Sequence, residues 1–129
     1  MSIQTFLGSI NFGDQTLENY KKAIWTPVGS GCTLIVNSAV YIRIGDIVIA
    51  QFDVTWPTTA NGDVAFIGGL PIAPATGLFG VIFGYSNETL TVTIYGDASG
   101  LTLRSVTNTA LTNAQLSEKR VAGMAVYFL

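Results

Sequence analysis

Apolar and polar residues alternate along most of the chain after residue 33. The clearest case is the range 47–56, in which every second residue is apolar: Val48, Ala50, Phe52, Val54 and Trp56. A period of two is typical of a β-strand that buries one face, and it places Gln51, Asp53 and Thr55 on the opposite, polar face. Pro57 is expected to end this strand, because proline has no N–H to donate to a neighbouring strand.

Further apolar segments follow at near-regular spacing, separated by turn sequences rich in Gly, Asn, Asp and Ser. About eight short strands of this kind predict an all-β fold, a single antiparallel β-sandwich or jelly roll. The expected strands lie at 33–36, 39–44, 47–56, 64–67, 78–85, 88–95, 101–106 and 121–129, with Asn37-Ser38 between the first two. The expected turns include Gly45-Asp46, Asn61-Gly62, Ser86-Asn87 and 97–100. The last strand is so apolar that it must be paired and covered.

Residues 1–24 have a different pattern, with isolated apolar residues among polar ones. We interpret this range as an extended N-terminal arm and 25–129 as the β-sandwich domain. Asp14 is expected to cap a short helical turn through Leu17 and Tyr20, and Thr112 or Asn113 to cap another in the range 111–120. The arm residues expected to contact a neighbouring protein are Ile3, Phe6, Leu7, Ile10 and Phe12.

The composition changes this picture in one respect, the way in which the surface is covered. Hydrophobic residues make up 49% of the 129 residues and charged residues only 11%, whereas soluble domains carry about 25% charged residues. Either uncharged polar residues cover the surface, or part of it is buried between subunits. A monomer would expose larger apolar patches than soluble monomers usually tolerate, so we expect an oligomer.

Charge and targeting signals exclude several classes of partner. The formal net charge of −2 argues against a nucleic-acid partner, which requires clustered Lys and Arg. The basic pairs Lys21-Lys22 and Lys119-Arg120 are interpreted as solvated surface. The N-terminal residues lack the features of a signal peptide, and no apolar run reaches the roughly 18 residues of a membrane-spanning helix. We therefore expect a protein made in the cytoplasm with no membrane partner.

Candidate catalytic and metal-binding residues are few. The chain has no His and one Cys, Cys32, which rules out a Cys–His nucleophile within one chain and in practice excludes a zinc site. Asp53 is the one acid expected in the middle of a strand, and a glycosidase would need a second carboxylate roughly 5–10 Å away. The other acids of the β region lie mostly in or beside expected turns, where they bond the local backbone. We predict no cofactor and no enzymatic activity.

Aromatic residues offer a second kind of candidate site, because their rings stack on sugars. Trp25, Tyr85 and Tyr95 are the candidate glycan-stacking residues. Trp56 continues the apolar face of its strand, so we place it in the core. Trp25 stands where the arm meets the domain and is first of all interpreted as a packing anchor.

Four motifs occur in order: "NYKKAIWTPVGSG", "YIRIGDIVIAQFDVTWP", "IGGLPIAP" and a terminal "VAGMAVYFL". This order resembles a β-sandwich module of bacteriophage tail fibres, tailspikes and other virion proteins, over residues 19–129. The resemblance implies a homotrimer packed about a threefold axis and no catalytic residues. The chain departs from such fibres in having no long shaft or repeat.

The resemblance leaves two functions open. The first is a capsid decoration, or cement, protein that binds the major capsid protein or other virion proteins through its arm. The alternative is a receptor-binding module of a tail fibre or tailspike that attaches to host surface glycans. Both place the protein on the virion.

Overall fold

The computed structural model describes residues 9–12, 15–75, 80–86, 92–97 and 99–129, with side chains for 19–75, 93–97 and 99–129. The described residues form strands joined by turns and loops, without a helix. None of them therefore belongs to an apolar helix of the length that crosses a bilayer. The strands are β1 (Ser9–Phe12), β2 (Gln15–Glu18), β3 (Lys21–Ile24), β4 (Ile35–Ile44), β5 (Ile47–Thr55), β6 (Phe66–Ile67), β7 (Gly80–Ser86), β8 (Val92–Asp97), β9 (Gly100–Ser105) and β10 (Arg120–Phe128).

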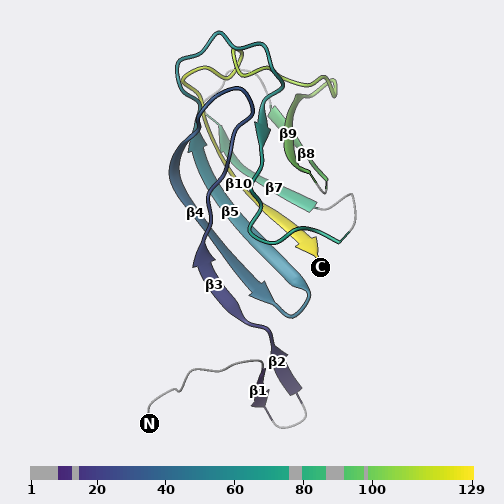
Figure 1. The fold of residues 1–129 in the computed structure, drawn as a ribbon. Coiled ribbons are helices and arrows are strands. Elements are labelled where there is room, and N and C mark those ends of the chain that lie inside the picture. The colour runs from purple at the N-terminus through teal and green to yellow at the C-terminus, as the bar shows by residue number, and fades with distance from the viewer. Residues whose placement is uncertain (1–8, 13–14, 76–79, 87–91, 98) are drawn as a thin grey trace.

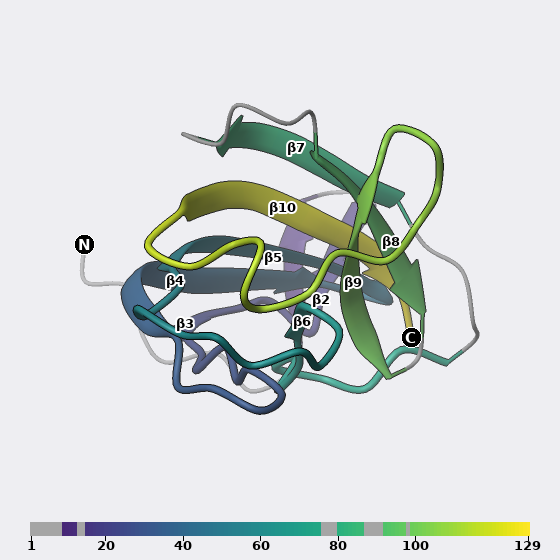
Figure 2. The same cartoon turned by 90° about the horizontal axis from the view of Figure 1, so that it is seen from above.

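Two antiparallel sheets make up the body of the molecule, as expected for a β-sandwich. The large sheet has the strand order β3-β4-β5-β10-β7 and the small sheet the order β6-β9-β8. The views in Figures 1 and 2 show the small sheet lying on one side of the large, twisted sheet. A separate hairpin of β1 and β2 extends beyond the end of the sandwich at which β3 begins (Figure 1). The prediction of an all-β fold with two packed sheets is confirmed.

The core lies between the two sheets and follows the predicted alternation. Val48, Ala50, Phe52 and Val54 have no exposed surface, and Trp56 is 1% exposed. The adjacent strand β10 is central, between β5 and β7, so the apolar C-terminal strand is paired on both sides as expected. Its inward residues and those of the small sheet complete the core: Val121, Ala125, Tyr127, Ile67, Leu101 and Leu103.

Two of the predicted local structures are wrong. Asn37-Ser38 does not separate two strands, because β4 runs on through these residues with a β-bulge between Val36 and Ser38. The pairing of Ser38 with Asp53 in β5 holds the chain extended there, so a tertiary contact overrides the local turn signal. The helical turn through Leu17 is wrong as well, since Leu17 lies in β2 and pairs with Ile10 of β1.

Other boundaries differ by a few residues. The Gly45-Asp46 turn is confirmed, and β5 has the predicted start. The predicted strand starts at 78 and 88, and the turn residue Asn87, lie outside the described residues. β3 lies within the range assigned to the arm, yet it pairs with β4 along its whole length. In the range 112–118 Thr112 and Gln115 bond each other reciprocally, in the manner of a capping box, around one turn that does not extend into a helix.

Candidate functional site

The face of the large sheet that points away from the small sheet, here called the outer face, carries the most distinctive grouping of side chains. Direct partners in an antiparallel sheet point to the same side. Tyr41, Ala50 and Ala125 form one row across β4, β5 and β10 on the core side. The rows on either side of it therefore project outward, and they divide the outer face into a polar half and an apolar half.

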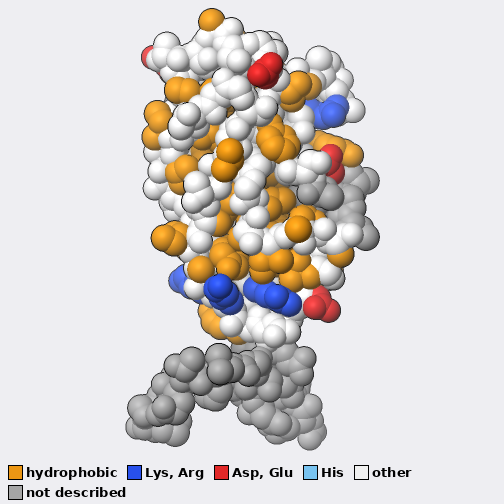
Figure 3. Space-filling model, viewed as in Figure 1, with side chains coloured by type: hydrophobic (Ala, Val, Ile, Leu, Met, Phe, Trp, Pro, Cys, Tyr) orange, Lys and Arg blue, Asp and Glu red, His pale blue; other side chains and the backbone are white. Residues whose placement is uncertain are grey.

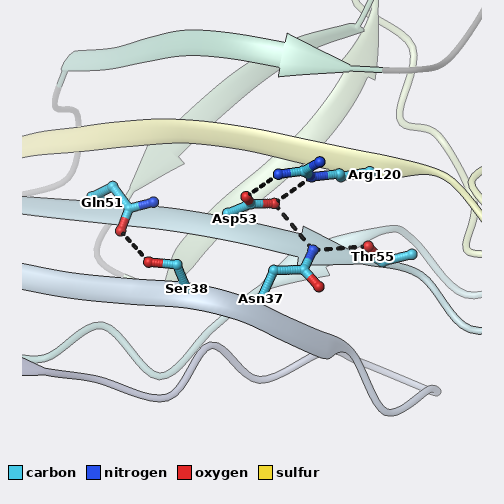
Figure 4. Close-up of polar contacts among 6 residues, drawn as sticks. All are labelled: Asn37, Ser38, Gln51, Asp53, Thr55 and Arg120. Atoms are coloured by element: carbon cyan, nitrogen blue, oxygen red, sulfur yellow. Dashed lines mark hydrogen bonds and ion pairs between the residues drawn. The ribbon is translucent and has the colours of Figure 1, made fainter.

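The polar half is a hydrogen-bonded strip across three strands (Figure 4). Arg120 of β10 reaches Asp53 of β5 with two parallel hydrogen bonds, Nε to Oδ1 at 2.9 Å and Nη2 to Oδ2. Asn37, in the bulge of β4, donates from Nδ2 to Asp53 Oδ1 at 3.1 Å and to Thr55 Oγ1 at 2.9 Å. Beside them Ser38 donates to Gln51 Oε1 at 3.3 Å.

The charge of Asp53 is stabilised by this strip. The hydrogen bonds from Arg120 hold the pKa of the Asp53 carboxyl below its usual value, against a smaller opposing effect of desolvation. A carboxylate that accepts two hydrogen bonds from a guanidinium and one from an amide N–H is held in its ionised form. Such a group is poorly suited to exchange a proton with a substrate near neutral pH. Asp53, the one acid expected in mid-strand, is thus placed in an ion pair.

The apolar half occupies the end of the outer face near the β4–β5 turn. Its rows are Ile42–Ile49–Val126 and Ile44–Ile47–Phe128, with Val40 and Met124 on either side of Gln51. Ile24 of β3 pairs with Val40 and extends the surface to the sheet edge. Five of these side chains are exposed: Ile24 by 81%, Phe128 by 67%, Ile44 by 42%, Ile47 by 39% and Met124 by 37%. We call Ile24, Val40, Ile42, Ile44, Ile47, Ile49, Met124, Val126 and Phe128 the apolar patch.

Three of the six basic side chains lie together at one end of the sandwich. Lys21 and Lys22 begin β3 and are exposed, and Arg43 pairs with Lys21 across the strands. Figure 3 shows basic side chains near the lower end of the described part, on a face that also carries several acidic side chains and a further basic one near its upper end. Three cations at one end of a chain of net charge −2 do not form the basic stripe that nucleic acid requires.

Two other acids, Asp97 and Glu118, accept hydrogen bonds away from Asp53. Asp97 accepts hydrogen bonds at Oδ1 from the N–H groups of Ser99 and Gly100, which closes the β8–β9 turn. Glu118 accepts at Oε1 from the Thr58 hydroxyl at 3.0 Å. Among the residues that the structure describes, no group of three or more His, Cys, Asp or Glu side chains is arranged to hold a metal ion.

The three candidate glycan-stacking residues fall in different environments. Trp25 is 7% exposed and donates from Nε1 to the carbonyl of Gln51 at 2.8 Å, so it is the packing anchor that the sequence indicates. Tyr95 is 40% exposed on the outer side of the small sheet, with the Arg104 guanidinium 5.1 Å from its ring centre. The side chain of Tyr85 lies outside the described residues.

The predicted arm contacts cannot be placed in the same way. Ile3, Phe6 and Leu7 lie outside the described residues. Ile10 and Phe12 belong to β1, whose backbone alone is described.

The sequence indicates Lys119-Arg120 as solvated surface and does not link Arg120 to Asp53, because the two residues lie 67 positions apart.

One apolar cavity of about 220 Å³ opens between the loop after Trp25 and the start of β4. Val28, Cys32, Leu34 and Val36 line it together with neighbouring residues of the same two segments. Burial raises the pKa of the Cys32 thiol, so Cys32 is a neutral, weakly nucleophilic side chain in this wall.

Comparison of the chain with protein-family models, with curated proteins and with solved structures finds no match. The function is therefore argued from the two faces of the sandwich and from the order of the sequence motifs.

Proposed function

We propose that the chain is a non-enzymatic structural protein of a bacteriophage virion, and that its role is capsid decoration. In this proposal the protein is made in the host cytoplasm and assembles as a homotrimer. Its sandwich is a jelly roll, and residues 1–24 act as an extended arm that clamps the major capsid protein or other virion proteins. No cofactor, nucleic acid or membrane takes part.

The observation that carries this proposal is the apolar patch. An antiparallel sheet needs only one apolar face to build a core, and the other face is then usually polar. Here the second face displays five large hydrophobic side chains that are between 37% and 81% exposed. A protein that functions by assembly needs such a surface, whereas Asp53, Glu118 and Asp97 are already bonded to an arginine, a hydroxyl and a backbone turn.

The motif order supports the choice of a virion protein among assembling proteins. The segment 41–57, which carries the strongest resemblance, forms the end of β4, the β4–β5 turn and β5. These elements carry Gln51, Asp53 and Thr55 of the polar strip and four of the nine residues of the apolar patch. The most recognisable stretch of the sequence thus coincides with the surface that an assembling subunit would use.

The experiment that tests the proposal locates the protein on the virion and removes it. Immunogold labelling of purified particles should mark the head, and heads that lack the protein should break at a lower temperature and under milder osmotic shock. Heads of unchanged robustness, on particles without label, would contradict the proposal.

The alternative, a receptor-binding module that attaches to host surface glycans, is favoured by one observation on the small sheet. Phe66, Thr102 and Tyr95 are direct partners across β6, β9 and β8, so two aromatic rings and a hydroxyl lie on one outward-facing row. Rings of this kind stack on the apolar faces of sugars, and Thr102 adds a hydrogen-bonding group between them.

A glycan array separates the two functions. If the protein is a receptor-binding module, Tyr95→Ala should abolish binding to the glycan that the unchanged protein retains. Tyr20→Ala is the matched control, because Tyr20 is similarly exposed, at 52%, and precedes β3 in the other sheet. Absence of binding to host cells and to all saccharides of the array would exclude the alternative.

A further inference from the structure

We infer that the apolar patch is the contact surface between copies of this chain, and that the polar strip lies outside this contact. The number of copies, three, rests on the proposed function. The location of the contact rests only on the side chains of the outer face. The occupant of the patch is a second copy of the same patch or of the surface beside it.

The first argument is that the patch is not needed for the core. The inward row Tyr41–Ala50–Ala125 already faces the interior, and all three residues are buried. The outward rows Ile42–Ile49–Val126 and Ile44–Ile47–Phe128, between this inward row and the β4–β5 turn, contain only Ile, Val and Phe. The strands β4, β5 and β10 are therefore apolar on both sides at this end, as strands are when a layer covers each side of their sheet.

The second argument is area. Side chains of the size of Ile, Met and Phe have on the order of 150–250 Å² of surface, so the five most exposed members of the patch leave on the order of 500 Å² of apolar surface in water. Soluble monomers rarely expose contiguous patches larger than a few hundred Å², and a standard interface takes about 800 Å² from each partner. The patch with its half-buried members and border fits the apolar centre of such an interface.

The third argument is charge. Among the described residues, Lys22 is the one charged side chain that its register places on this half of the face, and it stands beside Ile42 at the edge of the sheet. Depletion of charge at the centre with polar groups at the border is typical of subunit interfaces. A surface whose single charge lies at its border offers little to select a charged partner, but it packs well against another apolar sheet face.

The polar strip sets the limit of the contact. Asp53, Arg120 and Asn37 are already bonded to one another, and Arg120 is 49% exposed at its side chain. Covering this ion pair would remove two charges from water at a cost that its own hydrogen bonds do not fully offset. The strip is therefore expected to remain at the hydrated rim.

The experiment compares substitutions at two residues whose side chains are almost equally exposed in the folded chain. Phe128 in the patch is 67% exposed, and Val106, which follows β9 of the small sheet, is 66% exposed. The unchanged protein should sediment as an oligomer, and Phe128→Ser should raise its dissociation constant at least tenfold. Val106→Ser should leave the dissociation constant unchanged. The double variant Ile24→Ser/Phe128→Ser should sediment as a monomer. Its far-ultraviolet circular dichroism spectrum should match that of the unchanged protein, which would show that the variant is folded.

If the protein without substitutions is monomeric at every concentration, the inference is overturned. An oligomer that Phe128→Ser and Met124→Gln leave intact would also overturn it, because the contact would then lie elsewhere. A dimer that Phe128→Ser dissociates would support the surface and contradict the trimer of the proposed function. Asn37→Ala, on the polar strip, should leave the oligomer intact, and its dissociation would contradict the stated limit of the contact.

Discussion

The indole N–H of Trp56 donates a hydrogen bond of 2.8 Å to Oδ1 of Asn113, although 57 positions separate the two residues. Asn113 has no exposed surface, and its Nδ2 donates to the carbonyl of Ser30 and to Oδ1 of Asn61. One buried amide thus joins the end of β5 to three loops at the end of the sandwich opposite the β4–β5 turn. These loops keep their arrangement because the amide leaves no buried polar group of the cluster unpaired.

Replacing Asn113 by Ala should lower the free energy of unfolding by about 2–3 kcal/mol, because the buried N–H of Trp56 would lose its partner. Urea unfolding followed by tryptophan fluorescence measures the change. Asn37→Ala is the control, since Asn37 is exposed and its bonds to Asp53 and Thr55 can be replaced by water; it should cost less than about 1 kcal/mol. Equal losses in the two variants would show that the buried amide has no special role.

The loop after β6 is held close to the segment after Trp25, and Gly69 makes this approach possible. Gly69 has φ of 75°, and a Cβ at this position would lie 2.6 Å from the carbonyl oxygen of Thr26. Gly69→Ala combines an unfavourable left-handed backbone with a clash against main chain, so it should cost about 2–4 kcal/mol. Gly62→Ala should change the stability by less than about 1 kcal/mol, because nothing lies within 4 Å of its added Cβ. Thermal and urea unfolding of both variants check the contrast, which fails if Gly69→Ala is as stable as Gly62→Ala.

The sequence predicted the strands best where one face alone is apolar. In β5 the alternation of Phe52 and Val54 with Asp53 and Thr55 identifies the buried side directly, and the structure confirms it. At the other end of the same strand Ile47, Val48 and Ile49 are all apolar, so a period of two no longer separates the core side from the outer side. The sequence pattern therefore did not distinguish the exposed residues of the apolar patch from the buried residues of the same strands.

The remaining differences come from contacts between distant residues. Asn37-Ser38 has the composition of a turn, and only the pairing of Ser38 with Asp53 shows that the chain continues as a strand with a bulge. Asn113 was expected as one of two possible helix caps, a surface role, whereas its contact with Trp56 makes it part of the core. Local sequence carries no information on such partners, because they depend on the packing of the sheets.

The thiol of Cys32 should react slowly in the folded protein. Cys32 is half-buried in the wall of the apolar cavity, and burial raises the pKa of its thiol, so less thiolate is present near pH 8 than in the unfolded chain. The rate of reaction with 5,5′-dithiobis(2-nitrobenzoate) should be at least tenfold lower for the native protein than for the protein in urea. Equal rates in both states would show that the cavity wall opens freely.

The ion pair of Asp53 and Arg120 makes a pH-dependent contribution to stability whose sign follows from the pKa shift. The pKa of Asp53 is lower in the folded protein than its ordinary value, chiefly because of the hydrogen bonds from Arg120. The contribution is therefore fully present above the ordinary aspartate pKa of about 3.9, and it is lost as the pH falls through the folded-state pKa.

Asp53→Asn should be less stable than the unchanged protein at pH 7, and the difference should shrink below about pH 4. Urea midpoints measured from pH 7 to pH 2 test this, with Glu118→Gln, whose carboxylate also accepts a hydrogen bond, as the matched variant. A stability difference for Asp53→Asn that stays constant over the whole range would contradict the assigned shift.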